Sequence, residues 1–86
     1  MNYNKIYTNL IEKAKARRSF DFSYYESHHI LPRCMGGGNE KSNLVKLSAK
    51  EHFVAHHLLM KIYPSNKKLA KAFTMMFRNR DCILFT

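Results

Sequence analysis

Apolar residues recur every three or four positions over residues 3–17, which is the spacing of one face of an α-helix. They are Tyr3, Ile6, Tyr7, Leu10, Ile11 and Ala14. The other side of this stretch is basic and carries Lys5, Lys13, Lys15, Arg17 and Arg18. The pattern therefore predicts an amphipathic helix within a basic N-terminal segment, residues 1–18.

Short extended runs follow this helix. Aromatic residues alternate or crowd over residues 20–25, which favours an extended segment that runs into residues 26–31 and ends at Pro32. Three consecutive glycines at positions 36–38 predict a turn, because glycine accepts positive φ at little cost. The apolar residues of the segment 44–47 predict a second short strand, so we expect a two-stranded antiparallel hairpin.

Helical signals return at residue 48. Ser48 and Glu51 match a capping box, in which each side chain bonds the backbone N–H of the other residue. A helix should run from Ala49 to about Tyr63, since Pro64 blocks its continuation. We expect Ser65 to cap a C-terminal helix over residues 65–80. Together these elements predict a single α+β domain over residues 1–86.

The composition of the chain limits which kinds of partner it can bind. The chain has 15 Lys and Arg against 6 Asp and Glu, a net charge of +9 on 86 residues. This charge favours a polyanionic partner, and nucleic acid before an anionic membrane. A membrane-binding helix would be both strongly amphipathic and rich in large apolar residues around its basic face, and no stretch combines the two. Two cysteines are too few for a disulfide framework, and no apolar run approaches the roughly 18 residues that span a bilayer. We expect a cytoplasmic protein with no membrane partner.

All five histidines lie in two groups between residues 28 and 57. His52 and His56 are four residues apart, so on a helix they share one face at a spacing that suits chelation of a metal ion. His57 points away from that face. On a strand, His28 and His29 point to opposite sides, so at most one of them joins the helical pair. Three imidazoles with open positions left would be the catalytic form of a metal site.

The same stretch resembles the HNH nucleases, also called ββα-metal or His-Me finger nucleases. Their pattern is a His-His or Asp-His pair at the end of one strand, a glycine-containing loop, an Asn entering a second strand, and a His or Asn on the following helix. The chain supplies Glu26-Ser27-His28-His29-Ile30-Leu31-Pro32, Gly36-Gly37, Asn43-Leu44-Val45-Lys46-Leu47 and Glu51-His52-Phe53-Val54-Ala55-His56. Its histidine spacing is similar to that of the colicin-type DNases. The overall sequence of the motif is similar to that of the phage branch, which includes homing endonucleases.

The resemblance implies a small ββα-metal core over residues 24–63. It implies one divalent ion, Mg²⁺, Mn²⁺, Ni²⁺ or Zn²⁺, held by His28, His52 and His56. His29 would be the general base that activates water, and Asn43 would pin the loop and orient His29. The products would carry a 5′-phosphate and a 3′-hydroxyl, and the chemistry needs only one base and one cation.

Further residues have weaker signals. Glu26 lies two residues before His28 and therefore on the same strand face, where it would support a ligating ring or be a surface glutamate. Arg33 follows the strand and would hold the scissile phosphate or make a generic basic contact. The expected contacts to the DNA backbone are Lys13, Lys15, Arg17, Arg18, Lys67, Lys68 and Lys71.

The sequence thus predicts a metal-dependent endonuclease that nicks or cleaves double-stranded DNA, in a bacterial host cell if a phage encodes it. One alternative is a non-catalytic, zinc-stapled module that binds nucleic acid, which requires a closed metal site. Another is a basic interaction protein without metal. The apolar C-terminal residues, 81–86, leave a homodimer open.

Overall fold

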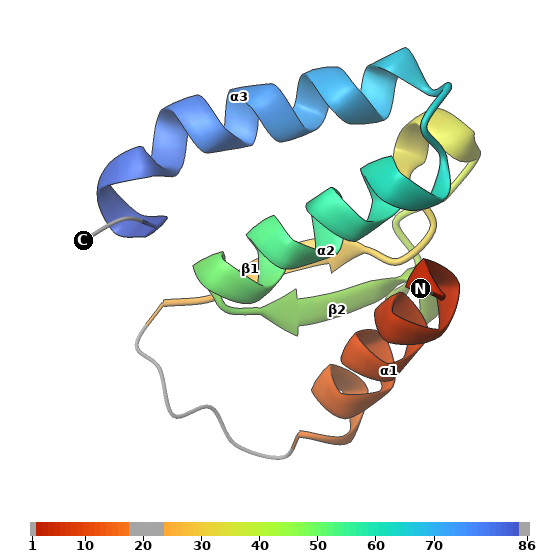
Figure 1. Ribbon diagram of the computed structural model, residues 1–86. Coiled ribbons are helices and arrows are strands. Elements are labelled where there is room, and N and C mark those ends of the chain that lie inside the picture. The colour runs from red at the N-terminus through yellow and green to blue at the C-terminus, as the bar shows by residue number, and fades with distance from the viewer. Residues whose placement is uncertain (1, 18–23, 85–86) are drawn as a thin grey trace.

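The computed structural model describes residues 2–17 and 24–84 of the chain, with side chains up to residue 75. Its elements are, in chain order, α1 (Tyr3–Ala16), β1 (Glu26–His29), the 3-10 turns η1 (Arg33–Met35) and η2 (Lys41–Asn43), β2 (Leu44–Leu47), α2 (Ala49–Ile62) and α3 (Lys67–Leu84). The two strands form an antiparallel hairpin, α2 follows it directly, and α1 and α3 lie on opposite sides of α2 (Figure 1). The predicted α+β class, with a hairpin, an N-terminal helix and a C-terminal helix, is confirmed.

Helix α1 begins and ends close to the predicted bounds. The side chain of Asn2 caps it by accepting a hydrogen bond from the backbone N–H of Lys5 at 3.1 Å. The helix buries Tyr7, Ile11 and Ala14, which belong to the apolar stripe of the sequence. The expected extended segment at residues 20–22 lies outside the described residues.

The hairpin places neighbouring residues on opposite faces. His28 pairs with Val45 and His29 with Leu44. His28 and Val45 are buried, whereas His29 and Leu44 lie on the outer face with partial exposure. This alternation separates the two adjacent histidines, as strand geometry requires.

Strand β1 ends two residues earlier than its extended sequence pattern predicts. Ile30 still donates its backbone N–H to the carbonyl of Asn43 at 2.8 Å. The backbone N–H and C=O of Leu31 instead bond the side-chain amide of Asn43, at 2.8 and 3.1 Å. A side chain therefore replaces the partner strand at this point, and the chain turns into η1.

The glycines of the loop are needed at two positions. Gly36 has φ of 96°, the left-handed region that favours glycine. Gly37 packs so closely that a Cβ there would lie 1.8 Å from the carbonyl oxygen of Leu31. The turn thus depends on glycine for conformation at one position and for space at the next.

Both later helices are capped by side chains. Ser48 accepts from the backbone N–H of Glu51 at 3.1 Å, and Glu51 accepts from that of Ser48 at 2.9 Å, so the predicted capping box is confirmed. The predicted cap of α3 at Ser65 is wrong. The side chain of Asn66 accepts from the backbone N–H groups of Lys68 and Leu69, which moves the start of the helix by one residue.

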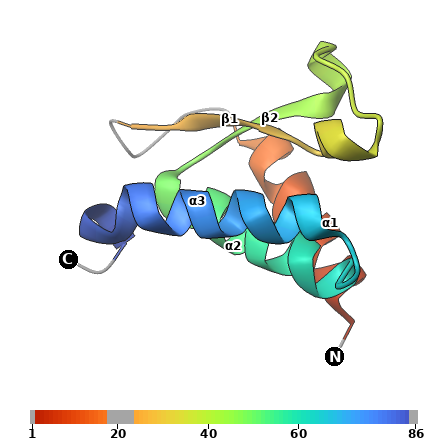
Figure 2. The same ribbon diagram turned by 90° about the horizontal axis from the view of Figure 1, so that it is seen from above.

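The core lies where α1, β2 and α2 meet, with one residue from α3. It consists of Tyr7, Ile11, Ala14, Val45, Leu47, Ala55, Leu58, Leu59 and Leu69. Seen from above, the hairpin covers one side of α2 while α3 runs along another (Figure 2). Within the described residues, His28 is the only buried polar side chain, at 1% exposure, and no helix is long and apolar enough to cross a bilayer.

Candidate metal centre

Three imidazoles converge between the hairpin and α2. His28 comes from the inner face of β1, and His52 and His56 come from one face of α2. One ring nitrogen of each lies within 4.8 Å of the other two, and the ring centroids are 4.8 to 5.2 Å apart. The structure thus brings together the three residues that the sequence analysis grouped as metal ligands.

Tyr7 determines which ring nitrogen of His28 carries the proton. The hydroxyl of Tyr7 donates to the carbonyl of Ile30 at 2.7 Å and so can only accept from the Nε2 of His28, at 2.8 Å. Nε2 of His28 therefore carries the proton and Nδ1 carries a lone pair. That Nδ1 is buried and has no hydrogen-bond partner among the described residues. A buried lone pair without a donor is what a metal ligand requires.

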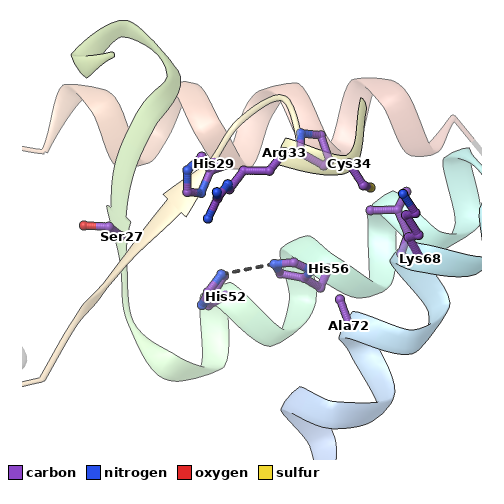
Figure 3. A pocket seen from close by; sticks show the side chains of 10 residues that line it. Ser27, His29, Arg33, Cys34, His52, His56, Lys68 and Ala72 are labelled. Atoms are coloured by element: carbon purple, nitrogen blue, oxygen red, sulfur yellow. Dashed lines mark hydrogen bonds between the residues drawn. The ribbon is translucent and has the colours of Figure 1, made fainter. Parts of the chain in front are cut away.

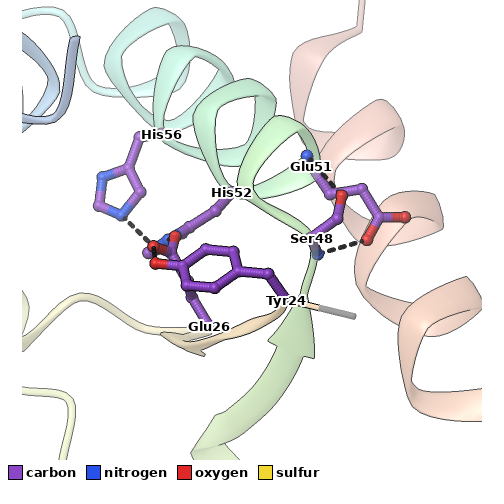
Figure 4. A network of polar contacts seen from close by, with 6 residues as sticks. All are labelled: Tyr24, Glu26, Ser48, Glu51, His52 and His56. Carbon is purple, nitrogen blue, oxygen red and sulfur yellow. Dashed lines mark hydrogen bonds and ion pairs between the residues drawn. The ribbon is translucent and has the colours of Figure 1, made fainter. Parts of the chain in front are cut away.

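Glu26 likewise determines which ring nitrogen of His52 carries the proton. The Oε1 atom of Glu26 lies 2.7 Å from Nδ1 of His52, and the hydroxyl of Tyr24 donates to the other carboxylate oxygen (Figure 4). Both partners are largely buried, since their side chains are 15% and 10% exposed. Nδ1 of His52 thus donates, and its Nε2 is left with a lone pair.

His56 completes the cluster from the next turn of α2. Its Nε2 lies 3.1 Å from Nε2 of His52, and the two rings point toward each other (Figure 3). Imidazoles bound at about 2.0–2.1 Å to one tetrahedral ion have nitrogens about 3.3 Å apart. The spacing of the two helical nitrogens is therefore close to that of ligands that share an ion.

Burial keeps all three rings neutral. Burial and, to a smaller extent, the neighbouring imidazoles lower the pKa of His28 to about 3 and those of His52 and His56 to about 4. A neutral imidazole can donate its lone pair to a cation at neutral pH, whereas a protonated one cannot. The donor set thus fits one divalent ion. In the described part of the chain, no fourth His, Cys, Asp or Glu joins the three, so the set leaves a coordination position open.

His29 lies beside this cluster and not within it. It lines a pocket of about 300 Å³ together with His52 and His56 (Figure 3). Its Nε2 is 2.8 Å from Oδ1 of Asn39, an acceptor, so Nε2 carries the proton and Nδ1 carries the lone pair. The lone pair is what a general base needs.

Asn43 makes the contacts expected to pin the loop, but not the expected one to His29. Its amide bonds the backbone of Leu31 at both N–H and C=O, and donates to the carbonyl of Gly38 at 2.9 Å. These bonds tie the two ends of the loop together. Its side chain makes no bond to His29, because both amide groups are engaged by backbone, and Asn39 of the same loop contacts the ring instead.

The basic residues expected to contact DNA fall on different parts of the surface. Arg33 and Lys68 line the pocket of His29, from η1 and from the first turn of α3. Lys67 and Lys71 are exposed on α3, whereas Lys13 and Lys15 are exposed on α1, on the other side of α2 (Figure 1). Arg18 lies outside the described residues.

Arg17 is engaged within the fold. Its guanidinium forms a two-fold ion pair with the carboxylate of Glu51, at 2.6 and 3.2 Å. Glu51 is also the last residue of the capping box of α2. The pair thus connects the end of α1 to the start of α2.

Sequence reasoning missed Tyr7, Tyr24 and Asn39. Tyr7 lies on the apolar stripe of α1, so its spacing marks it as a core residue and says nothing of its hydroxyl. Tyr24 lies two residues before Glu26 and therefore on the same face of an extended chain, a weak signal that was available. Asn39 follows three glycines, and its contact depends on how the loop turns.

Fold and site together define a small ββα-type core with a candidate three-histidine metal centre. The chain is 57% identical over 76 residues to the "Probable mobile endonuclease E" of Enterobacteria phage T4, covering 88% of this chain and 52% of that protein. It is 52% identical over 84 residues to the "Probable mobile endonuclease B" of the same phage, covering 94% of this chain and 31% of that protein. For the "Probable mobile endonuclease D" the values are 49% over 76 residues, 84% and 29%.

The chain thus spans about half of the first of these relatives and about a third of the others. No protein-family model matches the chain. No solved structure matches it significantly.

Proposed function

We propose that this chain is a metal-dependent DNA endonuclease domain of the HNH type. In this proposal His28, His52 and His56 hold one divalent ion and His29 is the general base. The observation that carries it is the convergence of three nitrogens, within 4.8 Å of one another, beside His29 in a single pocket. The names of its relatives, mobile endonucleases of phage T4, support a nuclease that acts on DNA.

The chain's own groups suit phosphodiester hydrolysis. Nδ1 of His29 would take the proton of the attacking water, while Nε2 stays bonded to Asn39 and keeps the ring in place. A bound divalent ion would supply neutralisation of the charge that develops on the phosphate and on the departing 3′ oxygen. Glu26 and Tyr7 would hold the ligating rings in the required tautomers.

Arg33 and Lys68 would hold the scissile phosphate in this pocket. They reach it from different elements, η1 and α3, and both line its wall with His29. Two cations near one phosphate strengthen its binding and oppose the charge gained during attack. Lys67 and Lys71 would contact flanking phosphates from the same helix.

The test is a plasmid-nicking assay on protein freed of metal and then supplied with Mg²⁺, Mn²⁺, Ni²⁺ or Zn²⁺. We expect nicking in at least one metal and a loss of about 10²- to 10⁴-fold in the His29→Ala variant. A His57→Gln variant is the matched control, since His57 lies on α2 outside the cluster and stacks on Phe73. Equal nicking by the wild type and His29→Ala would refute the role of His29 as general base. Tight metal binding without nicking in any metal would favour the non-catalytic module.

A further inference from the structure

A second groove opens on the outer face of the hairpin. Its volume is about 320 Å³, and it is lined by Ser27, Lys41, Leu44, Val45 and Lys46. Ser27 pairs with Lys46 in the ladder and His29 pairs with Leu44, so these four positions share one face of the hairpin. We call this hollow the Lys41–Lys46 groove.

The two lysines give this groove a positive charge. Neither forms an ion pair with any described residue, and both are exposed. The acidic residues Glu26 and Glu51 are bonded to His52 and Arg17. Glu40 is the acidic residue next to Lys41, and its carboxylate lies against Gly38 in the loop. The charge of the groove therefore suits an anion.

Lys46 is held in place by an aromatic ring. Its Nζ lies 4.7 Å from the ring centroid of Tyr25 and 3.5 Å from the hydroxyl of the same residue. A cation over a ring face is attracted to it but keeps its remaining donors free. Tyr25 is thus a positioning residue that fixes where this ammonium group meets a ligand.

The groove adjoins the proposed catalytic pocket at Ser27. Ser27 lines both hollows, and His29 is two residues further on the same face of β1. Two residues of a strand span about 7 Å, so Lys46, which pairs with Ser27, lies about 7 Å along the hairpin from His29. Lys41 lies on η2, three residues before Leu44, the partner of His29. The two lysines therefore lie close enough to His29 to reach phosphates that flank the scissile one.

We propose that the Lys41–Lys46 groove binds two backbone phosphates of the DNA strand that is cleaved, one at each lysine, beside the scissile bond. The strand then crosses β1 over Ser27, between this groove and the pocket of Arg33 and Lys68. The inference rests on the proposed nuclease function for its substrate. It goes beyond it by assigning two lysines and a tyrosine outside the catalytic pocket.

The experiment measures binding without cleavage. Fluorescence anisotropy of a labelled 20-bp DNA duplex is followed in EDTA over a range of salt concentrations, with wild type, Lys46→Ala, Lys41→Ala/Lys46→Ala and Lys46→Arg. The matched control is Lys61→Ala, which removes one exposed lysine from the last turn of α2. Unfolding curves check that each variant folds.

Each lost phosphate contact lowers the slope of log affinity against log salt by about 0.9. We expect a decrease of about 0.9 for Lys46→Ala and about 1.8 for the double variant, with weaker binding at every salt concentration. Lys46→Arg should restore the slope. If the lysine-to-alanine variants have the same slope as Lys61→Ala, or if the wild type does not bind DNA, the proposal that this groove binds phosphate is wrong.

The outcomes separate this inference from the proposed function. Because EDTA removes catalysis, normal slopes in the variants of a protein that nicks DNA would reject the groove alone. Reduced slopes in a protein that never nicks DNA would support the groove and reject the nuclease.

Discussion

Three histidines of the site each have one ring nitrogen assigned by a specific neighbour. Tyr7 takes Nε2 of His28, Glu26 takes Nδ1 of His52, and Asn39 takes Nε2 of His29. The remaining nitrogens are the ones that a metal ion or a proton can reach. Partners of this kind set the orientation and basicity of a ligand as strongly as the choice of ligand does.

Replacing Tyr7 by Phe should weaken metal binding by about 10- to 100-fold. The change removes the hydroxyl that accepts from Nε2 of His28 and keeps the ring in the core. The measurement is competition with a chromophoric chelator, which needs no catalysis. Tyr3→Phe is the control, because Tyr3 packs against the same core and makes no bond to a histidine of the site. Equal affinities of the two variants would contradict a role for the hydroxyl.

The chemistry-bearing residues were more predictable than their supporting partners. A strand separates adjacent side chains and a helix joins residues four apart, so local geometry groups His52 with His56 and lets only one of His28 and His29 join them. The choice of His28 came from the resemblance to the HNH nucleases. The partner of His29 does not follow from local geometry. Asn43 was expected to orient that ring, but its amide is engaged by loop backbone, and which asparagine reaches the ring depends on the path of the turn.

At the scale of elements, the loop between the strands is held by close contacts and not by regular structure. Asn43 bridges Leu31 and Gly38, and Gly37 donates its N–H to the carbonyl of Pro32 at 3.0 Å. The loop carries Arg33, which lines the proposed catalytic pocket, and Asn39, which bonds the ring of His29. The shape of the loop therefore determines the position of His29, the proposed general base.

Gly37→Ala should lower the free energy of unfolding by about 1–3 kcal/mol and slow nicking, because the new Cβ would overlap the carbonyl of Leu31. Metal affinity should change little, since the three proposed ligands lie outside the loop. Gly38→Ala is the control, because the three atoms nearest its Cβ would all belong to the movable side chain of Glu40. Urea unfolding and nicking rates measure both. A Gly37→Ala protein as active as Gly38→Ala would show that the loop adapts.

Element boundaries were predicted well where a side-chain cap or a proline marks them. The capping box at Ser48 and the end of α2 before Pro64 are examples. The start of α3 was misplaced because Ser65 and Asn66 are both good caps, and the sequence does not distinguish neighbours of equal propensity. The 3-10 turns carry no periodic pattern and were expected only as irregular loop.

At the scale of the whole molecule, the core of this small domain is joined to its polar site. The buried cluster reaches from α1 through β2 to α2, and His28 lies at its edge with 1% exposure. A domain of this size has a thin core, so an ion held by the proposed ligands would link β1 to α2 and add substantially to its stability.

Divalent metal should raise the melting temperature. At 100 times the dissociation constant, binding adds about 2.7 kcal/mol, which for a domain of this size is a shift of about 10–20 °C. His29→Ala should keep this shift, because it leaves the three proposed ligands intact, whereas His52→Ala should lose most of it. Differential scanning fluorimetry with and without EDTA makes the comparison. A full shift in His52→Ala would rule out this metal site.

Acid should destabilise the metal-free protein through the same histidines. Their pKa values lie near 3 to 4 in the folded chain, against 6.5 for an unperturbed imidazole. The unfolded state thus binds more protons in this range, so the free energy of unfolding falls as pH drops from about 6.5 to about 4. Urea unfolding at pH 7, 6, 5 and 4 measures the slope, and His57→Gln should leave it unchanged. A flat profile would mean that the cluster is hydrated in solution.

The bond between Tyr7 and His28 has a thermodynamic consequence for the N-terminal helix. Because α1 supplies the acceptor for a proposed ligand, docking of this helix and occupancy of the site are one linked equilibrium. Any change that leaves α1 undocked for a fraction of the time lowers the apparent affinity for the ion by that fraction, and the ion in turn favours the docked helix. A change in α1 that touches none of the histidines would therefore alter how tightly the proposed site holds its ion.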